Sequence, residues 1–373
     1  MAADLAHTPV SGIRVQLCGD CHLLNFGAFG TPERRVIFDI NDFDETLPGP
    51  WEWDIKRLAA SFVIAGRHNG FKKSDSREAV LRCAQSYREH MREYAALGAL
   101  EMWHQRIDEI VALARQNKWK KLLQKQIDAA ISRTVAHDDF PKLASVRKGK
   151  ARIKDNPPLI FHEAELAGKH NQLVRKAFLR YRETLTDDLK ALVDHYDLQD
   201  VAIKVVGVGS VGTRCGILLL MGNNGDPLFL QVKEAHTSVL APHAGKSIYS
   251  NSGQRVVSGQ RLMQSASDMF LGWTRHEGRD YYIRQLRDIK IKPMIEIMDS
   301  RRLANYGVWC GWALARAHAK AGDAAKISGY LGTNDRFDDA IADFAVAYAD
   351  QNDRDYKELL KAIRARRIKV YRE

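Results

Sequence analysis

Three side chains with oxygen donors occur near the start of the chain at spacings that suit phosphate chemistry. Asp20 and Asn25 lie in the segment GDCHLLN, and Asp42 follows seventeen residues after Asn25. Phosphoryl transfer needs a carboxylate that orients or deprotonates the attacking hydroxyl, and it needs oxygen ligands that hold Mg²⁺ against the nucleotide phosphates. We therefore expect Asp20 to be the catalytic residue, with Asn25 and Asp42 as metal ligands.

Asp42 belongs to an acidic cluster that also contains Asp39 and Asp44. Repulsion between close carboxylates is costly unless a cation neutralises them, which favours metal binding. We expect Asp44 to be a second metal ligand or its neighbour, and Asp39, within the strand itself, to be structural. The competing interpretation of Asp20 and Asn25 is a turn stabilised by bonds from their side chains to the backbone.

A glycine turn in the second half of the chain supplies further candidates. The turn GVGSVG connects two apolar strand-like segments, unlike the strand-to-helix setting of a dinucleotide-binding fold. Backbone N–H groups of such a turn can cover phosphates, and the expected contacts are Gly207, Gly209, Ser210 and Gly212. Lys233 follows Gly212 by twenty-one residues in another apolar strand, where a kinase carries the lysine that contacts the α- and β-phosphates.

The charge of a buried lysine needs a partner, and the sequence leaves the partner of Lys233 open. A kinase supplies a glutamate from a helix, but the segment GQRVVSGQRLMQSAS contains none. Glu234 points to the opposite face of the strand because successive side chains alternate. Gln260 or Gln264 could substitute, or Lys233 could pair with Asp42 or with phosphate directly.

The segment GDCHLLN resembles the H-G-D-x-x-x-x-N loop of the aminoglycoside and choline phosphotransferases, and Asp20 precedes Asn25 by the five positions found in kinases. NDFDETLPGPWEWDIKRLA is similar to their I-D-F/W-x-D segment, which continues through a Gly-Pro turn into a helix. The resemblance implies that Asp54, on that helix, braces the catalytic loop from behind. We expect His22 to pack within the loop, since Asp20 already occupies the position of the base. One departure is Cys18, where the family usually has His.

The order of these segments differs from that of an ordinary kinase. The catalytic and metal-binding segments occupy residues 19–45, whereas the glycine turn and its lysine lie within residues 200–290. LARAHA at residues 314–319 resembles the L-x-x-L-H helix that directly precedes the catalytic loop in the phosphotransferases. A circular permutation, cut between that helix and the loop, explains these placements, and termini that lie close together make such a cut tolerable. The implied fold is α+β: a two-lobed, circularly permuted protein-kinase-like fold with a small antiparallel-sheet lobe and a mainly helical lobe.

Across almost its full length the chain also resembles an uncharacterised bacterial family, domain of unknown function 2252. Typical segments are FDINDFDETLPGPWEWDIKRLAAS, GVGSVGTR, LQVKEA and LARAHAKAGD. Membership implies no established activity. Family members usually continue upstream of the position of Met1, which leaves open the structural partners of residues 1–16.

The elements that must position these residues follow from the spacing of apolar side chains. The expected elements are strands around residues 36–38, 201–206, 213–222, 228–235 and 281–286, and helices within 53–116, 163–196, 253–268 and from 305 onward. The basic segment near 140–158 is typical of an exposed connector. We expect a catalytic-loop and helical lobe at 1–198, a β-rich nucleotide-binding lobe at 199–300, and C-terminal helices at 301–373 that return to the helical lobe.

The chain of 373 residues carries a net charge of +11. A window from Arg115 to Lys154 holds twelve basic residues against three acidic ones, so the rest of the chain is nearly neutral. The charge allows an anionic acceptor, but aromatic side chains for base stacking are scarce in that window, which argues against nucleic acid. No apolar run suits a membrane span, and the lack of a signal or transit pattern favours a cytoplasmic location.

Five scattered cysteines are too few for a disulfide framework, and their number is odd. Cys18 and Cys21 form a CxxC segment, but no second pair completes a four-ligand zinc site. Reduced thiols are therefore expected.

Together these patterns predict an ATP- and Mg²⁺-dependent phosphotransferase that acts on an unknown hydroxyl acceptor. Transfer of AMP instead of the γ-phosphate could use the same groups with ATP reversed. A nucleotide-binding regulator without catalysis is a rival of another class, suggested by the missing acidic partner of Lys233. A nucleic-acid-binding protein is the remaining alternative.

Overall fold

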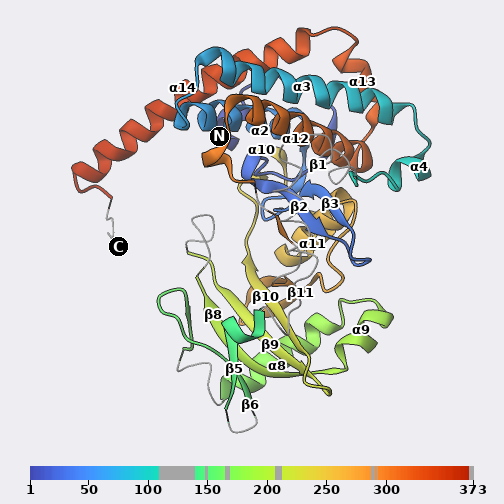
Figure 1. Cartoon of the computed structure of the whole chain (residues 1–373), viewed down its shortest axis with the longest axis vertical. Helices are drawn as coiled ribbons and strands as arrows, with labels where there is room; N and C mark the ends of the chain where they lie inside the picture. Colours follow the sequence, from blue (N-terminus) through green and yellow to red (C-terminus); the bar gives the residue numbers. More distant parts are fainter. Residues whose placement is uncertain are drawn as a thin grey trace.

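The computed structural model describes residues 1–108, 139–147, 150–163, 169–205, 212–286, 290–291 and 293–368. Helices gather at one end of the molecule and a large sheet at the other, with short strands and helices between them (Figure 1). The fold is therefore mixed α and β, with small antiparallel sheets and a helical portion, as the sequence predicts.

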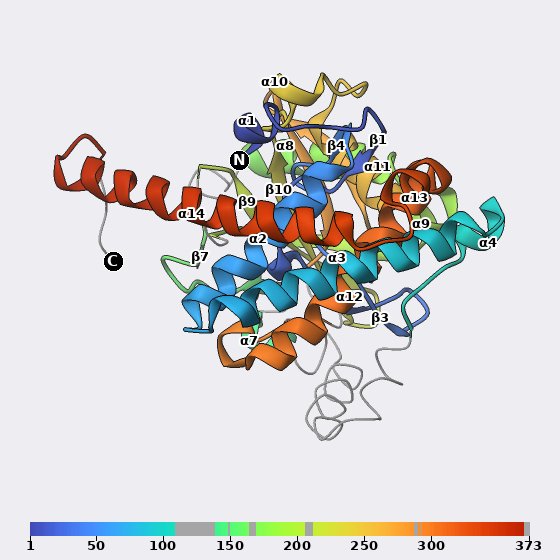
Figure 2. The same ribbon diagram turned by 90° about the horizontal axis from the view of Figure 1, so that it is seen from above.

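Four long helices build the helical end: α2 (Glu52–His68), α3 (Lys73–Ala95), α12 (Ser300–Ala321) and α14 (Arg336–Arg364). In α2 the side chains of Ile55, Leu58 and Phe62 recur at helical spacing and are fully buried. Helix α14 runs across α2 and α3 (Figure 2), and a buried ion pair of 2.7 Å between Arg88 and Asp338 joins α3 to it. The last described helix thus packs on the first long ones.

Shorter helices at this end are α1 (Ala2–Leu5), α4 (Ala99–Trp103), η5 (Ile295–Ile297) and α13 (Ala324–Leu331). The helix expected from residue 305 starts earlier, because the Asp299 carboxylate caps α12 by accepting the Arg302 N–H at 2.8 Å. Within the described ranges, no helix combines the length and apolar content that crossing a bilayer requires.

Six antiparallel strands form the large sheet, in the order β11-β12-β10-β9-β8-β7. Their bounds are β7 (Ile160–Phe161), β8 (Tyr196–Lys204), β9 (Cys215–Gly222), β10 (Pro227–Ala235), β11 (Gly272–His276) and β12 (Arg279–Gln285). The turn between β9 and β10 needs Gly225, whose φ of +78° lies in the left-handed region. The antiparallel strands expected between residues 201 and 235 are therefore present.

Helices and a hairpin cover both faces of the large sheet, and they come before most of its strands in the sequence (Figure 1). They are α7 (Phe140–Leu143), β5 (Ala144–Arg147), β6 (Lys150–Ile153), α8 (Lys169–Arg182) and α9 (Asp187–Val193). Ile153 packs with Phe229 on one face, and Tyr181 packs with Leu218 on the other. The expected basic connector thus contains a hairpin, which the Ile153 N–H fixes to the sheet by donating to Asp200 at 2.7 Å.

One expectation about this region needs correction. The single helix expected from Glu163 to Tyr196 is interrupted: α8 ends at Arg182, Thr186 precedes α9, and Tyr196 already begins β8. The elements β5 to α9 precede the expected lobe boundary at residue 199, and they bury their apolar residues against the large sheet. Local spacing did not specify which lobe these elements would join.

Short strands and helices lie between the helical end and the large sheet (Figure 1). Strand β1 (Arg14–Leu17) pairs with β4 (Leu47–Pro50), while β2 (Phe26–Gly30) lies between β3 (Val36–Ile40) and β13 (Lys290–Ile291). Helices α10 (Ala241–Ala244) and α11 (Ser252–Met263) complete this region. Because β2 follows GDCHLLN and β3 precedes NDFDE, their pairing holds the two acidic segments next to each other.

Candidate active site

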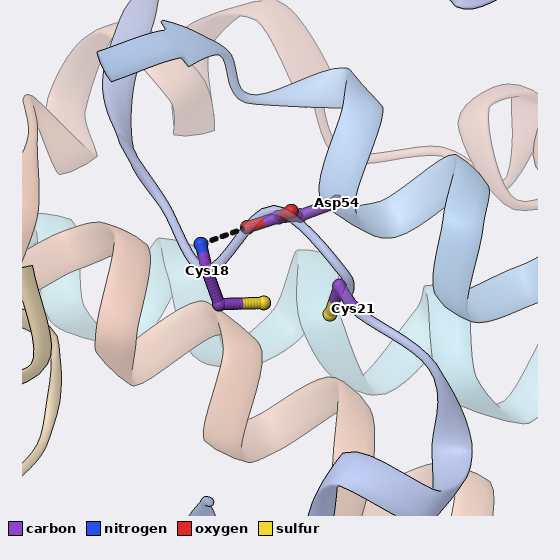
Figure 3. Close-up of side chains that lie close together, drawn as sticks. All are labelled: Cys18, Cys21 and Asp54. Carbon is purple, nitrogen blue, oxygen red and sulfur yellow. Dashed lines mark hydrogen bonds between the residues drawn. The ribbon is translucent and has the colours of Figure 1, made fainter. Parts of the chain in front are cut away.

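The loop GDCHLLN is anchored to α2 by the buried carboxylate of Asp54 (Figure 3). Asp54 accepts the backbone N–H groups of Cys18 at 2.8 Å and Gly19 at 3.1 Å. Gly19 is required here, because its φ is +92° and an added Cβ would lie 2.4 Å from the carbonyl oxygen of Glu45. Asp54 therefore fixes the start of the loop to α2.

Helix α12, from the far end of the sequence, packs beside the same loop. His318 of the LARAHA segment lies 3.2 Å from Asp54 through Nε2, and its Nδ1 lies 2.9 Å from the Tyr87 hydroxyl. Tyr306 donates its hydroxyl to the carbonyl oxygen of Leu23 at 2.7 Å. Two turns of α12 thus hold the loop at both of its ends.

Asp20 is half-buried at the tip of this loop and contacts two side chains. Arg57 of α2 donates to one carboxylate oxygen at 2.9 Å and 2.5 Å, and His22 Nε2 lies 3.5 Å from the other. Burial alone would raise the pKa of Asp20, but the bond from His22 and the Arg57 guanidinium outweigh burial and place that pKa well below its ordinary value. Asp20 is ionised at neutral pH, and His22 contacts it in addition to packing.

Arg57 was not identified from the sequence. It follows Asp54 by three residues, so both side chains lie on the same face of α2, toward the loop. This helical spacing was the signal available in the sequence. Asp54 anchors the backbone of the loop, and Arg57, one helical turn later, binds the carboxylate of Asp20.

Asn25 connects the two acidic segments. It lies at the end of the short helix η1 (Leu23–Asn25), and its side-chain amide donates to the carbonyl oxygen of Asp20 at 2.8 Å. Its own carbonyl oxygen accepts the backbone N–H of Asn41 at 2.8 Å. Asp20, Asn25 and the residue before Asp42 therefore lie within one hydrogen-bonded unit.

Lys233 lies beside the second acidic segment. Its ammonium group is 2.5 Å from Asp44, which also accepts the Tyr282 hydroxyl at 2.5 Å. Burial would lower the pKa of Lys233, but the neighbouring Tyr282, Asp42 and Asp44 outweigh burial and raise it. Burial likewise would raise the pKa of Asp44, but Lys233 lowers it, so both members of the pair are charged.

Asp44 therefore supplies the carboxylate that the sequence left unassigned. The expected substitutes are engaged elsewhere: Gln260 donates to Gln264 at 2.9 Å, and Gln264 donates to the carbonyl oxygen of Ile40 at 2.7 Å. Glu234 points away, as predicted from strand alternation, and accepts from Arg279 at 2.8 Å.

Helix α11 contains no acidic residue, and it contributes an arginine to the acidic segment. Arg255 is buried and donates to the carbonyl oxygens of Thr46 at 2.6 Å and of Asp44 and His236 at 2.8 Å. It fixes the backbone of the acidic segment and leaves the Asp44 carboxylate to Lys233. A sequence search for a helical acid could not find this contact, because the acceptors are backbone carbonyls.

Asp42 and Asn25 have the donor atoms that a hard cation such as Mg²⁺ needs. One oxygen of Asp42 accepts the Asp44 N–H at 3.1 Å, and among the described residues its other oxygen accepts no hydrogen bond. The Asp44 carboxylate is a poorer metal ligand in this arrangement, because its oxygens already accept hydrogen bonds from Lys233 and Tyr282. The residues therefore fit a magnesium ion at Asp42, with Asn25 beside that segment.

Asp39 is structural, as expected from its place within β3. Its carboxylate is fully buried and lies 2.7 Å from Arg316 of α12. The remaining oxygen accepts the backbone N–H and the hydroxyl of Ser265, each at 2.8 Å. The ion pair joins β3 to the helical end.

The predicted phosphate contacts Gly207, Gly209 and Ser210 lie outside the described residues. Gly212 is described: its φ is +85°, and an added Cβ would meet no atom within 4 Å. Gly212 directly precedes the segment that enters β9, the neighbour of the strand that carries Lys233. The phosphate-covering role of the glycine turn stays a prediction.

The thiols of Cys18 and Cys21 lie close to Asp54, with ligand atoms of the three residues within 4.8 Å of one another (Figure 3). Burial raises the pKa of the Cys18 thiol well above its usual value and that of Cys21 to about 11. Asp54 already accepts from two backbone N–H groups and lies within bonding distance of His318. The thiol pair is thus a buried, protonated packing element behind the loop.

Comparison with known proteins gives one match. The family described as an uncharacterised protein conserved in bacteria (DUF2252) matches residues 1–362. No curated protein and no solved structure matches the chain. The chemistry of the site therefore has to be argued from its own geometry.

Proposed function

The chain belongs to the bacterial family DUF2252, and we propose that it is an ATP- and Mg²⁺-dependent phosphotransferase with a circularly permuted kinase-like fold. The observation that carries the proposal is the ion pair between Lys233 and Asp44 next to Asp42, formed by residues 189 positions apart. A buried cation beside carboxylates suits a nucleotide phosphate chain and the metal that accompanies it. The acceptor is a hydroxyl compound of unknown identity.

The position of α12 supports the permuted order. Its LARAHA segment comes nearly three hundred residues after the GDCHLLN loop in sequence, yet His318 contacts Asp54, which anchors that loop. A helix that would directly precede the catalytic loop in the phosphotransferases thus lies beside it here. Moving the cut in the chain leaves such a contact intact, because packing depends on spatial neighbours and not on chain order.

In the proposed reaction Asp20 accepts a hydrogen bond from the acceptor hydroxyl and orients its oxygen toward the γ-phosphorus. As the new oxygen–phosphorus bond forms, the bond to the β–γ bridging oxygen breaks and the hydroxyl proton passes to Asp20. Arg57 and His22 hold the Asp20 carboxylate and keep it ionised.

On the nucleotide side, Lys233 contacts the α- and β-phosphates when these replace Asp44 as its partner. A bound Mg²⁺ would supply positive charge that neutralises the phosphates. Asp42 and Asn25 hold the ion, and the backbone of the glycine turn covers the phosphates.

The test compares two substitutions that preserve size. Asp42→Asn removes a metal ligand and should weaken binding of Mg·ATP, because that ligand acts in the ground-state complex. Asp20→Asn should leave the affinity nearly intact and lower the transfer rate by about 10²- to 10⁴-fold, because Asp20 acts mainly in the transition state. Asp187→Asn is the matched control, since Asp187 is a fully exposed surface aspartate.

Affinity is measured by calorimetry, and transfer by incubation with labelled ATP and a cell extract. Label in the γ position that reaches an acceptor supports phosphoryl transfer, whereas transfer of an α label identifies the nucleotidyl alternative. Tight binding without either transfer identifies a regulator. Equal Mg·ATP affinity in both variants would mean that the two aspartates have been assigned wrongly, and unchanged turnover of Asp20→Asn would refute the mechanism.

A further inference from the structure

Arg284 of β12 lies on the same sheet face as Lys233. Lys233 is paired in register with Tyr282, and Gln231 is paired with Arg284. Directly opposed residues of an antiparallel pair share a face, and so do alternate residues of one strand. Arg284 is therefore one cross-strand pair away from Lys233, with its guanidinium carbon 5.8 Å from the centre of the Tyr282 ring.

The charge of Arg284 has no close carboxylate partner in the part of the chain that the structure describes. Its Nε donates to the neutral Gln231 side chain at 3.3 Å, and Nη1 lies 3.5 Å from the carbonyl oxygen of Asn41. Both distances are at the long end for hydrogen bonds of a guanidinium, which has five N–H donors. Lys233 by contrast is paired with Asp44 at 2.5 Å.

The surrounding charges point in the same direction. Burial would lower the pKa of Arg284, but the neighbouring Tyr282, Asp42, Asp44 and Asp268 outweigh burial and raise it, so the guanidinium is charged. Arg284 and Lys233 are therefore two charged donors on one face of the sheet. A bound magnesium ion would add positive charge to this region, which an incoming anion would balance.

A cavity of about 320 Å³ gives access to Arg284. Asn41 and Gln264 also line it, and its acidic residue, Asp268, is already engaged by the backbone N–H groups of Phe270 at 2.8 Å and Gln285 at 2.5 Å. The cavity therefore brings a ligand within reach of Arg284, with the Asp268 carboxylate held by backbone donors. A space of this size accommodates a phosphate group together with part of the molecule that carries it.

We infer that Arg284 binds a phosphate group, and that the site takes a ligand whose phosphates reach from the Lys233 and Asp42 region to this cavity. The inference rests on the proposed nucleotide site, because it treats that region as the other end of the same anion site. Arg284 is a specificity-determining residue: it favours polyphosphate-bearing ligands over uncharged nucleosides. A planar guanidinium suits this role because it can donate two parallel bonds to phosphate oxygens.

Three variants test the inference. Arg284→Gln removes the charge, Arg284→Lys restores it without the planar fork, and Arg279→Gln is the matched control. Arg279 lies on the same strand but forms an ion pair with Glu234, which is on the sheet face opposite Lys233. Calorimetric titrations use Mg·ATP, magnesium tripolyphosphate and adenosine, and thermal unfolding verifies that each variant is folded.

We expect Arg284→Gln to weaken binding of ATP and tripolyphosphate by about 10- to 100-fold, the effect of losing one charge-assisted bond, and to leave adenosine unaffected. Arg284→Lys recovers part of the loss, and Arg279→Gln binds like the wild type. Wild-type affinity of folded Arg284→Gln for tripolyphosphate would overturn the inference, as would failure of the wild type to bind any phosphate compound. If the wild type binds tripolyphosphate through Arg284 but does not bind ATP, the anion site is supported and the proposed nucleotide function is refuted.

Discussion

Replacing Asp54 by Asn probes the anchor that holds the proposed catalytic loop. Asn has the same shape as Asp but only one acceptor oxygen. Its NH2 group would take the place of the other oxygen and would face an N–H donor. If the oxygen keeps the Cys18 N–H and His318, the Gly19 N–H loses its acceptor. An unsatisfied buried donor costs about 1–3 kcal/mol, and each of the two bonds that becomes neutral loses about 1 kcal/mol.

The expected loss of unfolding free energy is therefore about 3–5 kcal/mol. With an unfolding entropy of about 2.1 cal/mol/K per residue, a cooperative chain of 373 residues loses about 1.3 °C in Tm for each kcal/mol. Asp54→Asn should thus lower Tm by about 4–6 °C, measured by circular dichroism during heating. A loosened loop should also expose Cys18 and Cys21, which are buried in the folded protein, to a thiol reagent.

The control is Asp187→Asn at an exposed position, where a change within about 0.5 kcal/mol is expected. If Asp54→Asn shifts Tm no more than this control does, and its thiols react no faster than those of the wild type, then Asp54 does not anchor the loop. The reasoning from three contacts to one carboxylate would then be wrong.

Three further perturbations follow from the same geometry. Gly19→Ala should lower Tm and abolish transfer, because the φ of Gly19 is +92° and the new Cβ would lie 2.4 Å from the carbonyl oxygen of Glu45. Normal turnover of this variant would contradict the described loop. Arg316→Met leaves Asp39 buried without its cation and should cost about 3–5 kcal/mol in a denaturant titration, whereas an unchanged midpoint would show that the pair is not needed. Burial and then the neighbouring Arg316 lower the pKa of Lys320 to about 8, so between that pH and about 10.5 the folded chain binds fewer protons than the unfolded chain. The stability that Lys320 contributes should therefore rise with pH in this range. Lys320→Gln should lose that rise, and an identical pH profile of stability for both proteins would contradict the prediction.

Local patterns were sufficient to predict most elements near the site. Strands β8, β9 and β10 are rich in apolar residues and are separated by glycine-containing segments, so their identity depends on short-range preferences. The one long helix expected between Glu163 and Tyr196 was wrong, since apolar spacing continues across the break after Arg182. The basic segment near residue 150 became a hairpin because Ala151 and Ile153 find an apolar sheet face to cover, which no local signal specifies.

By itself the sequence determined the residue types and spacings on which the site depends. Asp20, Asn25 and Asp42 are close in sequence, so a short loop and one pair of strands suffice to bring them near one another. Tertiary structure alone decided the partners that come from distant segments. Lys233 meets Asp44, and His318 meets Asp54, because sheet, loop and helix pack around one buried region, and a buried charge is stable only where that packing supplies its counterpart.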